Sequence, residues 1–249
     1  MSGHSKWSTI KRQKGAADAK RGTLFTKLSK EIEAAARSGD PNPEMNFKLR
    51  LAVQKARDSN MPVDNIDRAI KRASGALSGA QPAEHHYEGY GPSGAAILIE
   101  VLTDNKNRTT AEVRNVFSRG GGNLGENGCV TWIFQPKGVI VVEASGNADD
   151  LALLAIDAGA EDVKQDGDTL EIQTIPEELE AVRKKLEAQN IKITSSELTR
   201  IPQNTVALDK KSAIQALKLM ERLEELDDVQ RVYTNADFPE DAIAEYGGQ

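Results

Sequence analysis

The sequence predicts a multidomain α and α+β protein: an N-terminal three-helix domain with a basic arm, followed by two ferredoxin-like α+β domains, one inserted in the other. Apolar residues recur at helical spacing up to residue 75, and the pattern then changes to short β runs between helices. Within residues 136–202 the elements come in the order β-α-β-β-α-β, which is that of a complete ferredoxin-like unit. The flanking pieces, 96–135 and 203–235, each have the order β-α-β and together make a second such unit.

The first 75 residues are predicted to hold the arm and three helices. Residues 1–22 contain three glycines and few large apolar groups, so we expect an extended or partly helical arm without a core of its own. The first helix begins near Leu24 and ends at Gly39, where a turn rich in proline follows. The second and third helices are expected at 44–58 and 63–73, because apolar side chains fall on one face of each.

Residues 76–95 are rich in Gly, Ser, Pro and Ala, and are predicted to be a linker. Strands are expected beyond it at 97–103, 129–134, 138–143, 162–165, 168–174, 191–199, 204–208 and 228–234. Helices are expected at 109–119, 148–158, 177–189 and 211–225. The predicted domains are 1–75, 76–135 together with 203–249, and 136–202. The alternative is two successive domains cut near residue 160, which leaves an odd β-α-β unit with an uncovered sheet edge.

The net charge of −6 is distributed unevenly along the chain. Residues 1–75 carry 16 Lys and Arg against 8 Asp and Glu, a balance of +8, and residues 76–249 carry 16 against 30, a balance of −14. The first 30 residues hold eight basic side chains and one acid, Asp18. A basic end on an acidic protein indicates contact with nucleic acid. The alternative is a solvated helical domain that is basic by chance.

The composition excludes several classes of protein. No apolar run approaches the length of a transmembrane helix, and the polar, basic start is not a secretory signal. A single cysteine, Cys129, excludes a disulfide framework, and we expect it to be an inert thiol within a strand. With only His4, His85 and His86 as histidines, we expect no metal site and no cofactor. We therefore expect a cytoplasmic protein.

The glycine-rich motifs are interpreted as turns. Residues 89–94 match G-x-G-x-x-G, but a dinucleotide site has a helix after this motif, and here a strand follows. Residues 119–125 follow a predicted helix, whereas a phosphate-binding loop precedes one, so we do not expect a phosphate site here. A contact of Arg119 with an RNA backbone stays open as an alternative. Residues 103–109 are expected to be a turn that leads to a helix cap at Thr109 or Thr110. We expect this segment to have a structural role first and a role in surface recognition second. No paired catalytic groups are found, so we expect no enzymatic activity.

The basic arm is the strongest functional signal in the sequence. Phosphate contact needs cations on a chain that can follow a nucleic-acid backbone, and the glycines of the arm give that freedom. Trp7 either stacks on a splayed base or packs on the helical domain, and both readings stay open. The α+β units are acidic and poor in aromatics, so we do not expect them to be stacking platforms. The predicted nucleic-acid-binding residues are His4, Lys6, Trp7, Lys11, Arg12, Lys14, Lys20, Arg21, Lys27 and Lys30.

Several motifs resemble those of the YebC/PmpR family, which includes the mitochondrial translational activator of cytochrome c oxidase. They run in order along nearly the whole chain: Gly3-His4-Ser5-Lys6-Trp7, Asp18-Ala19-Lys20-Arg21-Gly22, Phe25-Thr26-Lys27, Asn60-Met61-Pro62, Ile66-Asp67-Arg68-Ala69-Ile70, Tyr87-Glu88-Gly89-Tyr90-Gly91-Pro92, Thr103-Asp104-Asn105-Lys106-Asn107-Arg108-Thr109 and Gly121-Gly122-Asn123-Leu124-Gly125. Phe47 stands where the family often has proline, and Cys129 replaces a residue that is often serine. Neither departure touches the arm.

The resemblance implies one helical domain followed by two α+β domains, and a cytoplasmic, non-enzymatic protein of gene expression. Members of that family are described as DNA-binding transcriptional regulators, or as factors that help ribosomes through difficult stretches such as proline runs.

Three hypotheses of function follow. The first is a nucleic-acid-binding regulator, either a duplex-DNA transcription regulator or a ribosome-associated translation factor that relieves stalling. Its partners are DNA or ribosomal RNA, with the ribosome included and no membrane; the oligomeric state is left open, with a monomer favoured. The second is an enzyme that uses the loops at 89–94 or 119–125. The third is a protein-interaction scaffold whose acidic α+β domains bind a basic partner.

Overall fold

The computed structural model describes residues 18–75, 82–144 and 147–247. Residues 134–203 form one compact unit, and the described residues before and after this stretch form the other. The chain therefore leaves the larger unit after Ile133 and returns to it at Asn204. The predicted fold class is confirmed, because N-terminal helices are followed by α+β domains, one of which interrupts the other in sequence.

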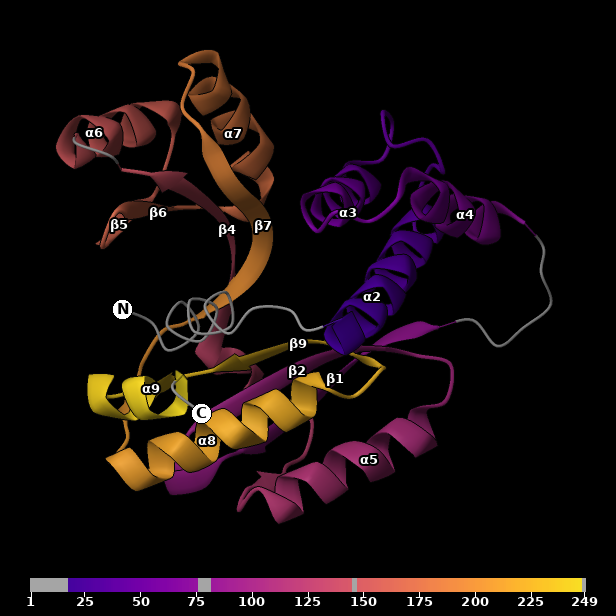
Figure 1. The fold of residues 1–249 in the computed structure, drawn as a ribbon, viewed down its shortest axis with the longest axis vertical. Coiled ribbons are helices and arrows are strands. Elements are labelled where there is room, and N and C mark those ends of the chain that lie inside the picture. Colours follow the sequence, from indigo (N-terminus) through magenta and orange to yellow (C-terminus); the bar gives the residue numbers. More distant parts are fainter. Residues whose placement is uncertain (1–17, 76–81, 145–146, 248–249) are drawn as a thin grey trace. The chain divides into compact units, whose positions relative to one another are not determined.

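The N-terminal helices are α2 (Asp18–Arg37), α3 (Phe47–Asp58) and α4 (Val63–Ser74), shown in indigo and violet in Figure 1. Both α3 and α4 pack on α2. Asn46 caps α3 by accepting a hydrogen bond from the Leu49 N–H, and its amide donates to the Ala35 carbonyl 2.8 Å away. The turn between α2 and α3 is thereby tied to the end of α2. The buried core of the three helices consists of Leu28, Ile32, Ala35, Ala36, Leu49, Ala52, Val53, Ala56, Met61, Ile66 and Ala69.

The first sheet has the strand order β3-β1-β2-β9, and all neighbours are antiparallel. Its strands are β1 (Ala83–Tyr90), β2 (Ala96–Thr103), β3 (Asn123–Leu124) and β9 (Val229–Thr234). Helices α5 (Lys106–Arg119) and α8 (Lys210–Glu224) lie side by side on one face of this sheet (Figure 1). The core between sheet and helices includes Ile97, Ile99, Val101, Val113, Phe117, Leu217, Met220, Leu223, Val229 and Val232.

Two predictions about this sheet are wrong. The predicted linker 76–95 contains β1, a central strand paired with both β2 and β3, and a short 3-10 helix, η1 (Pro92–Gly94). The predicted strand 129–134 is instead a bend followed by the 3-10 helix η2 (Thr131–Ile133). The residues of β1 are mostly polar, so the sequence has no apolar pattern that would predict a strand here. They form a strand because β1 pairs with a neighbouring strand on each edge. Two of the four strands of this sheet are therefore not those that the sequence indicated. The predicted strand 204–208 contributes no strand to it, so the flanking pieces do not each supply the predicted β-α-β order.

Three small elements complete the larger unit. The strand β8 (Val206–Ala207) pairs in parallel with β10 (Ala236–Asp237) as a separate two-stranded sheet. The helix α9 (Glu240–Gly247), which the sequence pattern did not indicate, packs on α8.

The inserted unit has the predicted β-α-β-β-α-β order. Its sheet is antiparallel throughout, with the strand order β5-β6-β4-β7 of a ferredoxin-like unit, and α6 and α7 pack together (Figure 1). The elements are β4 (Phe134–Glu143), α6 (Ala148–Ala158), β5 (Asp162–Asp166), β6 (Thr169–Thr174), η3 (Pro176–Glu178), α7 (Leu179–Ala188) and β7 (Ile193–Pro202). The buried side chains of this unit include Ile140, Val142, Leu170, Ile172, Leu179, Val182 and Leu186.

Candidate nucleic-acid interface

Most of the predicted nucleic-acid-binding residues lie before the described part of the chain. The residues in question are His4, Lys6, Trp7, Lys11, Arg12 and Lys14. Lys20 and Arg21 belong to the backbone of α2, but their side chains lie outside what the structure describes. Lys27 and Lys30 are described in full. The structure therefore describes the side chains of two of the ten predicted residues.

Lys27 and Lys30 both point from α2 to the end of α8 and the start of β9. The Lys27 ammonium donates to the carbonyl of Glu224. The Lys30 ammonium donates to the carbonyl of Asp227 at 3.1 Å and to Oδ1 of Asp228 at 2.9 Å. These two cations attach α2 to the α+β part of the larger unit.

Asp228 collects four donors from three parts of the chain. Lys30 reaches Oδ1, while Oδ2 accepts hydrogen bonds from the hydroxyls of Thr103 at 3.0 Å and Thr109 at 2.7 Å and from Arg108 Nη2 at 2.9 Å. The Asp228 side chain is 4% exposed, so it depends on these partners. Burial would raise the pKa of Asp228, but the hydrogen bonds from Arg108 and Lys30 outweigh burial and hold the pKa well below its usual range. We call these five residues the Asp228 cluster.

The Asp228 cluster explains the motif at residues 103–109. The helix cap is Asn105, whose side chain accepts from the Arg108 N–H, and not Thr109 or Thr110 as the sequence indicated. The Thr109 hydroxyl is used inside the cluster instead. Arg108 also contacts Asp104, at 3.0 Å. The observed contacts of this motif are thus structural.

Glu31 makes a second connection between α2 and the sheet. Its carboxylate lies 2.8 Å from Lys55 Nζ on α3 and 3.5 Å from Arg231 Nη2 on β9. Burial would raise the pKa of Glu31, but the charges of Lys55 and Arg231 lower it below its ordinary value.

Glu88 on β1 holds the loop that follows β3. Its carboxylate accepts hydrogen bonds from the backbone N–H groups of Gly128, Val130 and Thr131, at 2.6, 2.8 and 2.8 Å. The side chain is buried, which alone would raise the pKa of Glu88, but these donors lower the pKa below its usual value. Cys129 lies in this loop, half-buried, and burial together with the charge of Glu88 raises the pKa of its thiol. A raised pKa disfavours the reactive thiolate.

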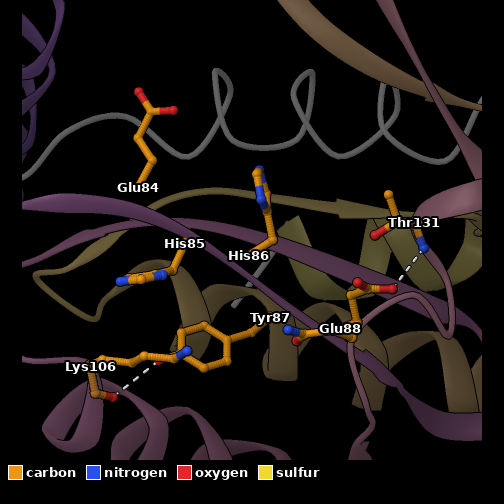
Figure 2. Close-up of a pocket in the computed structure, with 8 residues that line it drawn as sticks. Glu84, His85, His86, Tyr87, Glu88, Lys106 and Thr131 are labelled. Atoms are coloured by element: carbon orange, nitrogen blue, oxygen red, sulfur yellow. Dashed lines mark hydrogen bonds between the residues drawn. The ribbon is translucent and has the colours of Figure 1, made fainter. Parts of the chain in front are cut away.

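A pocket of about 370 Å³ lies beside β1 and this loop (Figure 2). It is lined by Glu84, His85, His86, Tyr87, Glu88, Lys106, Asn127 and Thr131. Figure 2 shows the two histidine rings pointing away from each other, as neighbouring residues of a strand do. His86 Nε2 lies 3.7 Å from Glu100 Oε1. Within the described ranges, no three side chains of His, Cys, Asp or Glu are grouped to hold a metal ion.

Sequence reasoning missed the residues that organise this region. Asp228 and Glu88 are not among the residues that the sequence predicts to be functional. Asp228 and Glu88 act through partners that are distant in the chain, so no local spacing marks them. Trp132 falls within the predicted strand 129–134 but lies on η2, where its side chain is exposed.

The fold defines a multidomain α and α+β protein, in which a ferredoxin-like unit is inserted into the sequence of an α+β domain. Lysine side chains of the N-terminal helix α2 bind that α+β domain. Two family profiles match the chain: "TACO1/YebC protein N-terminal domain" over residues 5–76, and "TACO1/YebC second and third domain" over residues 82–236. The chain therefore belongs to the TACO1/YebC family.

Full-length relatives agree with this assignment. A "probable transcriptional regulatory protein" of Dehalococcoides mccartyi (strain CBDB1) is 56% identical over 100% of both chains. A protein of the same name from Moorella thermoacetica is 55% identical over 96% of both chains. The crystal structure of a conserved hypothetical protein from Aquifex aeolicus superposes with a TM-score of 0.82 at 48% identity, covering 90% of this chain and 93% of that one. Among the described residues, no helix is long and apolar enough to cross a membrane.

Proposed function

We propose that the protein is a non-enzymatic, cytoplasmic regulator of gene expression whose basic N-terminal arm contacts nucleic-acid phosphate. The charge distribution carries this proposal, because eight of the first 30 residues are basic and only one is acidic. The family supports it, since the relatives are named as probable transcriptional regulatory proteins. Lys27 and Lys30 have acceptors within the chain, so we assign them an anchoring role and give phosphate contact to the residues before them.

The target is either duplex DNA or ribosomal RNA, and we favour the ribosome. A ribosome offers both RNA phosphate and basic proteins, which suits a chain with a basic end and an acidic remainder. Co-sedimentation with ribosomes and binding to duplex DNA, each at low and near-physiological salt, separates the two. Retention on ribosomes while DNA binding fades supports a translation factor. Release from ribosomes with a preferred duplex retained supports a transcription regulator.

Replacing Lys11, Arg12 and Lys14 by Ala is expected to weaken binding to nucleic acid. If all three touch phosphate, the slope of log K against log salt concentration falls by roughly 2–3, because each neutralised phosphate releases about one counterion. Titrations at four or five salt concentrations measure the slope. The matched control replaces three exposed lysines of the inserted unit, Lys164, Lys184 and Lys192, by Ala, and should leave the slope unchanged. A slope that the arm variant does not alter contradicts the proposal.

The surface of α6 favours a second candidate function, a scaffold that binds a basic protein. Residues 134–203 carry 7 Lys and Arg against 14 Asp and Glu. On α6 the apolar side chains of Leu153, Leu154 and Ile156 are 65%, 39% and 48% exposed. Asp149, Asp150 and Asp157 lie on the same helix, so the exposed surface would suit a basic amphipathic partner. Deleting residues 1–22 distinguishes the candidates, since unchanged affinity for nucleic acid would favour the scaffold.

A further inference from the structure

Two aromatic side chains of the larger unit are exposed next to the loop at 125–131, which Glu88 holds. Trp132, on η2, is 66% exposed, and Tyr90, at the end of β1, is 40% exposed. The Trp132 indole N–H and the Tyr90 hydroxyl both donate to the same acceptor, the carbonyl oxygen of Cys129, each at 3.1 Å. The polar ends of the two rings therefore meet at one atom. Large exposed aromatics held in place by their polar ends are typical of binding surfaces.

The carbonyl that holds both rings is itself fixed. It belongs to the loop whose amides at 128, 130 and 131 bind the buried carboxylate of Glu88. The N–H of Gly125 also donates to the carbonyl of Glu88, at 2.7 Å. The rings thus stand on a loop that is hydrogen-bonded to a central strand of the sheet. Such support lowers the entropy cost of ordering the two side chains when a ligand binds.

The hydrogen bonds of the two rings restrict the class of ligand. Sites that bind proline-rich peptides commonly use tryptophan and tyrosine donors for the carbonyls of the peptide, and here both donors are already bonded to Cys129. What remains for a ligand is the ring surface, which recognises flat or apolar groups by stacking. Bases of a duplex stack on one another, so a base that stacks on protein must come from a single strand, a loop or a bulge.

We propose that Tyr90 and Trp132 form a stacking platform for unpaired nucleobases of single-stranded nucleic acid. The proposal rests on the proposed function and deepens it, because it gives the α+β part of the larger unit a contact with bases while the arm contacts phosphate. It differs from the expectation drawn from the sequence, which rested on the acidity and the low aromatic content of the α+β units. One ring lies at the end of a strand and the other on a 3-10 turn. Stacking tolerates every base, so the platform adds affinity without strong sequence preference.

The fluorescence of Trp132 provides a direct test. The chain has two tryptophans, Trp7 and Trp132, so a Trp7→Phe background leaves Trp132 as the single reporter. The probes are a 12-nucleotide oligouridine, which is unstructured, and a duplex of the same length. We expect quenching of Trp132 fluorescence as the single strand binds and little change with the duplex. All variants are compared in this one background, so any contribution of Trp7 is the same for each.

The affinity of variants gives a second measurement, taken by fluorescence anisotropy of a labelled oligouridine. Trp132→Ala is expected to weaken binding of the single strand by about 5- to 150-fold, in line with stacking energies of about 1–3 kcal/mol per base. The salt dependence should stay unchanged, because no phosphate contact is lost. Trp132→Phe should retain most of the affinity. Ile175→Ala, which truncates an apolar side chain of the inserted unit that is 40% exposed, is the control and should bind normally.

The outcomes separate this inference from the proposed function. If the protein binds nucleic acid and the arm variant lowers the salt slope, but Trp132→Ala binds normally and no quenching occurs, the stacking platform is refuted and the proposed function stands. If neither probe binds at low salt, the proposed function fails and the platform fails with it. Equal quenching by duplex and single strand would also overturn the assignment to unpaired bases.

Discussion

Replacing Asp228 by Asn is expected to lower the free energy of unfolding of the larger unit by about 2–4 kcal/mol. The aspartate is 4% exposed, and its two oxygens serve two cations and two hydroxyls. An asparagine keeps one acceptor oxygen, turns an NH₂ group toward donors and removes the charge that Lys30 and Arg108 face. Both cations are partly exposed and can recover some hydration, which keeps the effect below that of a fully buried pair.

Thermal and urea unfolding followed by circular dichroism measure this effect. For a unit of this size, a loss of that order lowers Tm by roughly 6–12 °C. Asp227→Asn is the matched control, since it makes the same chemical change at the neighbouring, exposed position and should alter stability by less than about 0.5 kcal/mol. Equal effects of the two substitutions would mean that the Asp228 cluster contributes nothing beyond its net charge.

The contribution of Asp228 should also depend on pH. Its pKa is lowered in the folded state, so the folded protein binds this proton less readily than the unfolded chain does. The stabilisation is therefore complete above about pH 4, near the pKa of an unfolded aspartate, and declines as the pH falls further. The stability difference between wild type and Asp228→Asn should stay constant from pH 7 to about 4 and narrow below it. A difference that widens in acid would contradict the assigned pKa shift.

The same variant examines the role of Lys30, one of the residues predicted to contact phosphate. In the structure its ammonium is shared between Asp228 and the Asp227 carbonyl. If Lys30 is an anchor, Asp228→Asn loosens α2 and leaves affinity for nucleic acid equal or lower. If Lys30 can bind phosphate once it is released from Asp228, the substitution should raise the affinity for nucleic acid and steepen its salt dependence.

The sequence indicated those elements whose determinants are local. The helices of the N-terminal part follow from apolar spacing, and the inserted unit from the alternation of strand and helix patterns along one stretch of chain. Strand β1 did not follow, because Glu84, His85, His86 and Glu88 give it no apolar alternation and its two neighbours in the sheet supply its stability. The division into three domains stays a prediction. Limited proteolysis between residues 76 and 81 would test the first boundary.

The candidate site divides in the same way. The basic character of the arm is a property of consecutive residues, and it is visible in composition alone. Lys27 and Lys30 are close to the arm in sequence, so the sequence predicts that they act with it. Their acceptors in the folded chain lie about 200 residues away and cannot be inferred from neighbouring residues. The run Cys129–Phe134 has the composition of a strand. Glu88 binds the amides of that run, and this leaves Trp132 exposed on a turn.

Replacing Glu88 by Ala is expected to destabilise the larger unit by about 2–4 kcal/mol and to loosen the loop at 125–131. The substitution removes the acceptor of three backbone N–H groups, and that of Val130 is buried where water cannot replace it. Glu84→Ala, on the exposed part of the same strand, is the matched control and should have little effect. Glu88→Gln keeps one acceptor oxygen and should fall between the two.

The local consequence of Glu88→Ala is open to direct measurement. Hydrogen exchange of the amides of Gly128, Val130 and Thr131 should speed up. In the Trp7→Phe background, iodide should quench Trp132 fluorescence more strongly when Glu88 is replaced, because the indole loses its fixed acceptor. If stability falls while exchange and quenching at the loop stay as in the wild type, Glu88 supports the sheet and not the loop. The stacking platform would then need another source of rigidity. If all three readouts change together, one buried carboxylate connects a central strand of the sheet to the surface on which Tyr90 and Trp132 are displayed.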